Sequence, residues 1–113
     1  MPGVNLEPND SSSLMLTVAV SATGGTITAI PSVTSQIIRV YKLFLTVTTA
    51  GTLQFEDGST ALSGAIALGA NGAVTLDLDG TPWFACSKGN AFTIVAGSGI
   101  TVAGQLYYRV TNY

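Results

Sequence analysis

The sequence predicts an all-β fold, an antiparallel β-sandwich or jelly roll of about eight strands. Three observations lead to this prediction. Several segments alternate apolar and polar residues with a period of two, which is typical of strands with one buried face. Gly, Asn and Asp mark turns between these segments at spacings of about 8–14 residues. The one Ala-rich segment that would tolerate a helix, ALSGAIAL, contains Gly64 and precedes Gly69, so we expect strand or irregular structure there.

The chain of 113 residues has the length of one domain. We therefore assign residues 14–113 to a single β-sandwich domain, since no internal repeat or linker indicates a second one. Residues 1–13, MPGVNLEPNDSSS, hold two Pro and a run of Ser, and only Val4 and Leu6 can bury apolar surface. We expect an extended N-terminal arm, either a disordered terminus or an arm that lies on a neighbouring subunit.

Two strands and a tight turn are expected at the start of the domain. The first strand has four apolar residues at alternate positions, Leu14, Leu16, Val18 and Val20. Gly24-Gly25 is then a hairpin signal. The following run, from Thr26 to Ile30, is rich in β-branched residues, and Pro31 ends it.

The segment from Gln36 to Thr48 is the longest strand candidate. Its apolar residues occupy both parities, with Ile37, Tyr41, Leu43, Leu45 and Val47 on one and Ile38, Val40 and Phe44 on the other. Apolar residues on both faces predict a central strand that is covered on each side. One cover would be the opposite sheet, and the other could be a second subunit.

Further turns divide the rest of the chain. Asp57-Gly58 and Asn71-Gly72 are strong turn signals, and the second leads into a strand that starts at Val74. Pro82 cannot lie in the middle of a sheet, so Trp83-Phe84 is expected to begin an edge or corner segment. After the turn signal Gly89-Asn90, a strand from Phe92 to Val95 follows.

Gly97 and Gly99 are expected to break that strand. In the last strand one parity is apolar, with Ile100, Val102, Leu106, Tyr108 and Val110. Tyr107 therefore faces away from the core and can serve an interface.

Charge and composition exclude several function classes. Charged residues make up 9% of the chain and the net charge is −2, so part of the surface must consist of uncharged polar residues or be buried against other subunits. Four scattered basic residues give no footprint for nucleic acid. No apolar run approaches the ~18–20 residues that span a bilayer, so no membrane partner is expected. The single Cys forms no intrachain disulfide.

Residues for catalysis are scarce. The chain has no His, which removes the commonest general base and transition-metal ligand. Cys86 is interpreted as a buried, inert thiol. Asp77 and Asp79 share one face of a strand and are interpreted as solubilising residues, with a Ca²⁺ site shared with Asp57 or a glycosidase pair as the alternatives. We therefore expect no enzyme, no cofactor and no metal.

Two segments carry a resemblance to a known family. VYKLFLTVTTAGTLQFEDGSTALSG and LDLDGTPWFACSKGNAFTIVAGSGITVAGQLYY resemble small β-sandwich proteins encoded among the structural genes of tailed bacteriophages. The shared pattern is a Lys-containing apolar strand, a hairpin to FEDG, then LD-x-DG-x-PWF, G-x-AF-x-I and V-x-G-x-x-YY. It runs from Val40 to Tyr108. These proteins are similar to capsid decoration, or cement, proteins, and related modules look like parts of head and tail fibres.

The resemblance implies a virion structural protein on the capsid surface, assembled in the host cytoplasm. Its partners would be the major capsid protein and further copies of itself, often as a homotrimer, although a dimer would suit the same features. The alternative is a receptor- or carbohydrate-binding module of a phage head or tail fibre. The residues expected at an oligomer or capsid interface are Val4, Leu6, Tyr41, Phe44, Trp83, Phe84 and Tyr107.

Overall fold

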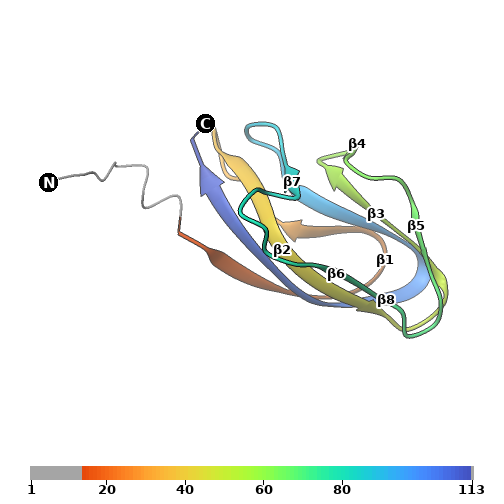
Figure 1. Cartoon of the computed structure of the whole chain (residues 1–113). Coiled ribbons are helices and arrows are strands. Elements are labelled where there is room, and N and C mark those ends of the chain that lie inside the picture. The colour runs from red at the N-terminus through yellow and green to blue at the C-terminus, as the bar shows by residue number, and fades with distance from the viewer. Residues whose placement is uncertain (1–13, 113) are drawn as a thin grey trace, which may run out of the picture.

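A computed structural model describes residues 14–112 of the chain. The predicted arm at residues 1–13, with Val4 and Leu6, lies outside the described residues. The strands are β1 (Leu16–Ile30), β2 (Ile37–Val47), β3 (Gly51–Asp57), β4 (Thr60–Ala61), β5 (Ile66–Leu68), β6 (Ala73–Leu76), β7 (Phe84–Ala85) and β8 (Phe92–Thr111) (Figure 1). The prediction of an all-β, antiparallel fold with about eight strands is confirmed. In the part that the structure describes, no helix is long and apolar enough to cross a membrane.

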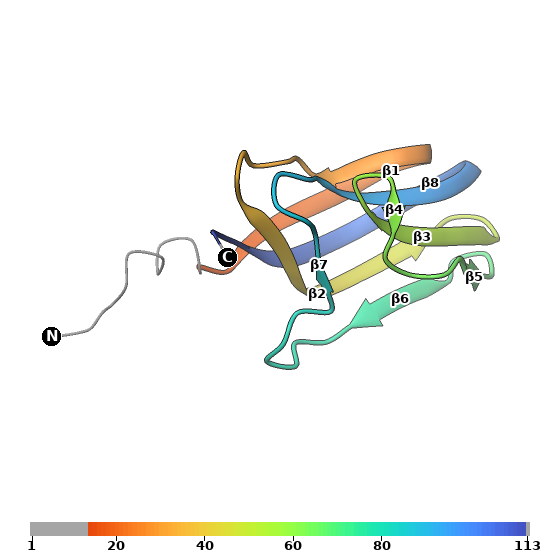
Figure 2. The same cartoon turned by 90° about the horizontal axis from the view of Figure 1, so that it is seen from above.

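All eight strands found in residues 14–112 belong to one sheet that is built around β8. The N-terminal part of β8 pairs with β3, and its C-terminal part pairs with β2. On its other side β8 pairs with β1 along nearly its whole length (Figure 2). β4 and β5 extend the sheet beyond β3, and β6 and β7 extend it beyond β2. The hydrogen bonding thus joins the strands into one sheet rather than two separate ones.

Glycine pairs bend the two longest strands where a turn and a break were expected. Gly24 and Gly25 have φ values of 60° and 67°, and the pairing with β8 shifts register between Thr23 and Gly25. Opposite them, Gly99 has a φ of 80°, and a Cβ added at Gly24 would lie 3.2 Å from the Gly99 nitrogen. Both strands continue through these residues. The predictions of a hairpin at Gly24-Gly25 and of a break at Gly97 and Gly99 are therefore wrong, because paired strands absorb the positive φ as a bend.

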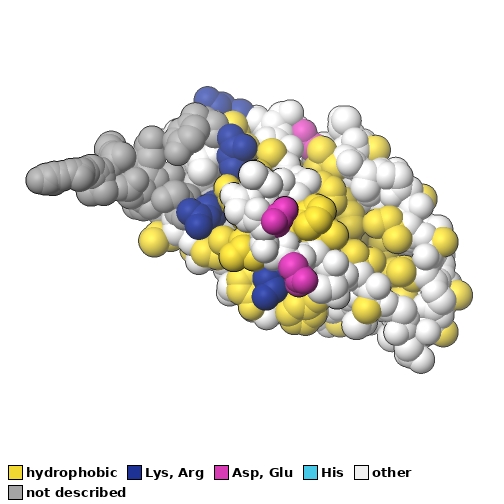
Figure 3. All heavy atoms as spheres, viewed as in Figure 1, with side chains coloured by type: hydrophobic (Ala, Val, Ile, Leu, Met, Phe, Trp, Pro, Cys, Tyr) yellow, Lys and Arg dark blue, Asp and Glu magenta, His cyan; other side chains and the backbone are white. Residues whose placement is uncertain are grey.

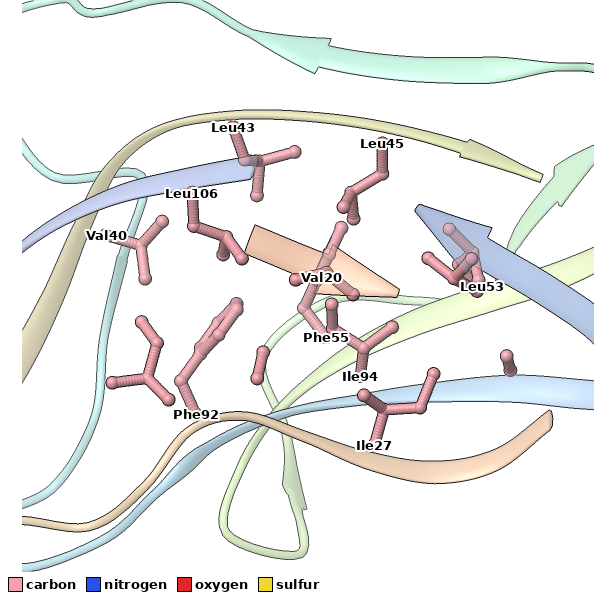
Figure 4. Close-up of a cluster of buried hydrophobic side chains, with 14 of the residues drawn as sticks. Val20, Ile27, Val40, Leu43, Leu45, Leu53, Phe55, Phe92, Ile94 and Leu106 are labelled. Carbon is pink, nitrogen blue, oxygen red and sulfur yellow. The ribbon is translucent and has the colours of Figure 1, made fainter. Parts of the chain in front are cut away.

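The core lies between the β2 part and the β3 part of this bent sheet. Figure 4 shows Leu43, Leu45 and Leu106 on one side of it and Phe55, Ile94 and Ile27 on the other. The largest fully buried side chains are Phe55, Phe92, Ile30, Ile38, Leu43, Leu45, Leu53, Ile94, Leu106, Val40 and Val102. Burial of each such side chain contributes roughly 1.5–3 kcal/mol to folding.

A β-bulge explains the apolar residues on both parities of β2. Val40 pairs with Tyr108 and Lys42 pairs with Tyr107, so Tyr41 is the additional residue. The parity of the inward side chains changes at this point, and Ile38, Val40, Leu43, Leu45 and Val47 all lie on the buried face. The pattern therefore needs no second covering layer. Phe44, 42% exposed, is the large apolar residue that β2 leaves on its outer face.

Candidate interaction surface

The outer face of β2 and β8 brings together three of the predicted interface residues. Tyr41 and Phe44 come from β2, and Tyr107 comes from β8. Basic side chains accompany them, so we define the aromatic face as Arg39, Tyr41, Lys42, Phe44, Tyr107 and Arg109. Figure 3 shows basic side chains close to hydrophobic ones on the half of the molecule where β8 ends in Figure 1. Three of the chain's four basic residues, which look scattered in the sequence, thus share one face.

Cation–π contacts hold the two tyrosine rings. The Lys42 Nζ lies 5.2 Å from the centroid of the Tyr107 ring, and the Arg109 Cζ lies 5.2 Å from that of Tyr41. Contacts of this kind contribute about 0.5–1 kcal/mol each at exposed sites. Because the rings are already positioned, they lose less side-chain entropy when a partner binds.

Arg39 is held by a hydrogen bond of its own. It is the direct cross-strand neighbour of Arg109, an arrangement that places two like charges side by side. The Arg39 Nε donates a hydrogen bond of 3.1 Å to the Thr111 Oγ1. Arg109 is drawn towards the Tyr41 ring. Each arginine of the aromatic face thus has a contact that helps to position it, Thr111 for Arg39 and the Tyr41 ring for Arg109.

Trp83 and Phe84 point in opposite directions from the start of β7. The Trp83 N–H donates to the Val40 carbonyl at 2.8 Å, and its indole Nε1 donates to the Asp77 carbonyl at 2.7 Å. The indole is 45% exposed. Phe84 instead packs in the core, 5.0 Å from Phe55 between ring centroids. The structure thus places Trp83 beside β2 at the surface and gives Phe84 a packing role, while the interface predicted for both stays a prediction.

A polar cluster around the buried Asp57 joins the end of β3 to the loop before β8. The Asp57 Oδ2 accepts a 2.9 Å hydrogen bond from the Ser87 N–H, and its Oδ1 accepts one of 2.9 Å from the Asn90 Nδ2. Burial acts to raise the pKa of Asp57, but the hydrogen bonds from Ser87 and Asn90 outweigh it and hold the pKa below its usual value. The sequence marks Asp57 and Asn90 only as parts of separate turns, and no local signal pairs them.

The Cys86 thiol lies in the core, whereas Asp77 and Asp79 lie beyond Leu76, the last residue of β6. Cys86 is buried, as predicted, and burial together with the nearby Asp57 charge raises the pKa of its thiol to about 12. Asp77 and Asp79 are exposed. Within residues 14–112 no group of three His, Cys, Asp or Glu side chains is placed to hold a metal ion. The same residues enclose no pocket.

The surface most suited to recognition is therefore a face and not a cavity. It unites Tyr41, Phe44 and Tyr107, with Trp83 at the neighbouring edge. Sequence reasoning missed that Arg39, Lys42 and Arg109 belong to it, because strict alternation puts Arg39 and Lys42 on opposite faces and only the bulge at Tyr41 brings them to the same one. No family model, curated protein or solved structure matches this chain.

Proposed function

We propose that this protein is a virion structural protein, a capsid decoration or cement protein that binds the outside of a phage head and stabilises the coat subunits. It acts without catalysis, as a homo-oligomer, with the major capsid protein as its partner. The same proposal includes a β-sandwich or jelly-roll arrangement, in which the two parts of the bent sheet serve as the two layers.

The observation that supports this proposal is the aromatic face. Its rings are exposed or half-buried and displayed on a sheet surface instead of in a hollow, and its two tyrosine rings are held by neighbouring cations. Tyr, Phe and Arg are enriched at the centres of protein interfaces, where each well-packed anchor removes water from both partners. A broad face of this kind suits a protein partner better than a small molecule.

Low charge supports the same function. Charged residues amount to only 9% of the chain, and the exposed positions of β1 after Leu16 are filled by Thr, Ser, Ala and Gly. A surface with so few charges causes little electrostatic repulsion of a partner. Many copies bound side by side on a capsid would also convert weak single contacts into strong retention.

Binding to capsids tests the proposal. Purified protein is incubated with expanded, undecorated capsids and co-sedimented, with the Phe44→Ala and Tyr107→Ala variants beside the wild type. We expect the wild type to sediment in high copy number and each variant to bind at least about ten-fold more weakly, as for an interface anchor worth more than 1 kcal/mol. Leu78→Ala, which removes another exposed apolar side chain outside the aromatic face, is the control and should bind as the wild type does. Wild-type protein that ignores capsids would refute the function.

The second candidate is a carbohydrate- or receptor-binding module of a phage fibre, and Trp83 favours it. Its exposed indole is fixed by the hydrogen bond to the Asp77 carbonyl, which is how a ring is held ready for stacking on a sugar. The two functions separate in one experiment. A fibre module would bind host polysaccharide and lose that binding in Trp83→Ala, whereas a decoration protein binds capsids and ignores glycans.

A further inference from the structure

The outer edge of β1 is a feature that the aromatic face does not use. β1 pairs with β8 from Leu16 opposite Tyr108 to Ile30 opposite Phe92. No strand pairing among the described residues uses its other edge, and Figures 1 and 2 show β1 on the outside of β8. In an antiparallel strand the N–H and C=O groups of alternate residues point away from the partner. This edge therefore presents a row of donors and acceptors that matches another strand.

Among residues 14–112, short strands limit the other edges of the sheet, whereas the edge of β1 is long. The peripheral strands β4, β5, β6 and β7 are two, three, four and two residues long, whereas β1 has 15. Natural sheets blunt long edges with charged residues or Pro, and β1 contains neither. Its only irregularities are the bend at Gly24-Gly25 and a register shift near Ile30. From Leu16 to Thr23 the pairing with β8 is regular, so this length is ready for pairing.

We propose that this edge pairs with the same edge of a second copy of the chain, antiparallel and about a two-fold axis at Ala19. Leu16 then lies opposite Ala22 of the second copy, and Val18 lies opposite Val20. Directly opposite residues point to the same face of a sheet. The inward apolar row of both copies therefore stays on one side, and the two sheets join into one.

Exposed side chains and the absence of charge identify the occupant as a second copy. Leu16, the first residue of β1, is 42% exposed, and Leu14, just before the strand, is 63% exposed. In the two-fold pairing Leu16 lies beside the Ala22 position of the second copy, which covers it. A two-fold interface brings each residue near its own equivalent, so a charged strand would repel itself. β1 has no charge and meets no such repulsion.

This inference is independent of the proposed function. A two-fold contact closes with two copies, so it predicts a dimer, while the family resemblance implies a trimer. A capsid-binding trimer would overturn the β1 pairing and leave the decoration function standing. A dimer that does not bind capsids would support the β1 pairing and refute the decoration function.

Matched charge substitutions test the pairing in the full-length protein. Ala19 and Ala73 are both exposed on edge strands, β1 and β6. Ala19→Lys places two positive charges directly opposite each other at the axis, and Ala73→Lys is the control. By light scattering we expect the mass of two subunits for the wild type and for Ala73→Lys, and a dissociation constant raised at least about ten-fold for Ala19→Lys.

A mixing experiment shows whether the variants are folded. Ala19→Glu alone should also dissociate, and an equal mixture of the Lys and Glu variants should restore the dimer, because opposite charges now meet at the axis. The proposal would be overturned by a wild-type monomer, by a mass of three subunits, or by a dimer that Ala19→Lys leaves intact. It would also be overturned if the Lys and Glu variants keep the far-ultraviolet spectrum of the wild type, dissociate, and then fail to pair with each other.

Discussion

The β3 end of the molecule, which we define as Phe55, Asp57, Phe84 and Phe92, has aromatic and charged side chains as the aromatic face does. The β3 end buries its rings in the core, whereas the aromatic face leaves them at the surface. At the β3 end, the rings of Phe55, Phe84 and Phe92 pack on one another with centroids 5.0–5.9 Å apart, and the carboxylate of Asp57 is held by hydrogen bonds. On the aromatic face the rings lie at the surface and their neighbours are cations. The difference teaches that residue type alone does not separate stability from recognition. The partners of each ring do.

The largest effect should come from truncating a ring at the β3 end. Phe55→Ala removes a side chain with no exposed surface and leaves a cavity beside Phe84 and Phe92, which we expect to lower the free energy of unfolding by about 3–5 kcal/mol. Phe44→Ala, on the aromatic face, should cost less than about 1 kcal/mol, because an exposed ring leaves little cavity. Urea denaturation measures both. Equal losses in the two variants would erase the distinction between the regions.

A substitution at Gly104 should be the next largest. Gly104 has a φ of 155°, and a Cβ added there would collide with the Phe44 carbonyl oxygen and lie 2.9 Å from the Leu45 Cα. Since the obstacle is main chain, β8 would have to move away from β2 beneath the aromatic face. We expect Gly104→Ala to destabilise the fold by about 1–3 kcal/mol. In Gly64→Ala a Cβ meets nothing within 4 Å, so thermal unfolding close to the wild type is expected for this control.

The polar cluster at the β3 end should make stability depend on pH. The pKa of Asp57 is lower in the folded chain than in the unfolded one, so its contribution is complete above the unfolded value of about 3.9 and disappears as the pH falls through the folded value. Asp57→Asn should lower the free energy of unfolding at neutral pH by about 1–2 kcal/mol and flatten its fall in acid.

Denaturation at a series of pH values measures this effect. Asp79→Asn, at an exposed position, serves as the control and should retain the acid dependence of the wild type. If the Asp57→Asn profile instead runs parallel to that of the wild type, the cluster does not stabilise the charged carboxylate.

The smallest effect should come from the cations of the aromatic face. Lys42→Gln removes the contact with the Tyr107 ring and should cost at most about 1 kcal/mol of stability. Lys88→Gln, at an exposed position in the loop before β8, gives the baseline for losing one positive charge. A loss of several kcal/mol in Lys42→Gln, measured by urea denaturation, would mean that the aromatic face is part of the stabilising core after all.

The sequence predicted the number and kind of elements better than their continuity. A long apolar run located β2, and period-two alternation located the inward row of β8, because burial on one face leaves a local pattern. The glycine bends and the bulge at Tyr41 were missed, since a positive φ permits a turn, a bend or a bulge and only the paired strand decides among them. The Asp57–Asn90 contact was missed because it joins residues 33 positions apart, and no local pattern pairs them.

Candidate surface residues were predicted in part. Opposite parity correctly separated Tyr107 from Tyr108, because alternate residues of a strand face opposite ways. Phe84 could not be assigned inward from sequence, since its strand has two residues and shows no period. The gathering of three cations on one face depends on which strands are neighbours, and single-strand patterns do not contain that information.

The central position of β8 has a consequence for how the protein is made. β1, β2 and β3 all take their main pairing from β8, which is the last of the eight strands along the chain. During translation the first three long strands leave the ribosome without the strand that joins them. Closing such distant pairings is slow, and the waiting strands are open to contact with other nascent chains. The pairing of β1 and the joining of the β2 part to the β3 part must therefore wait until residues 92–111 have been made, whereas local pairings such as β2–β6 and β3–β5 can form earlier.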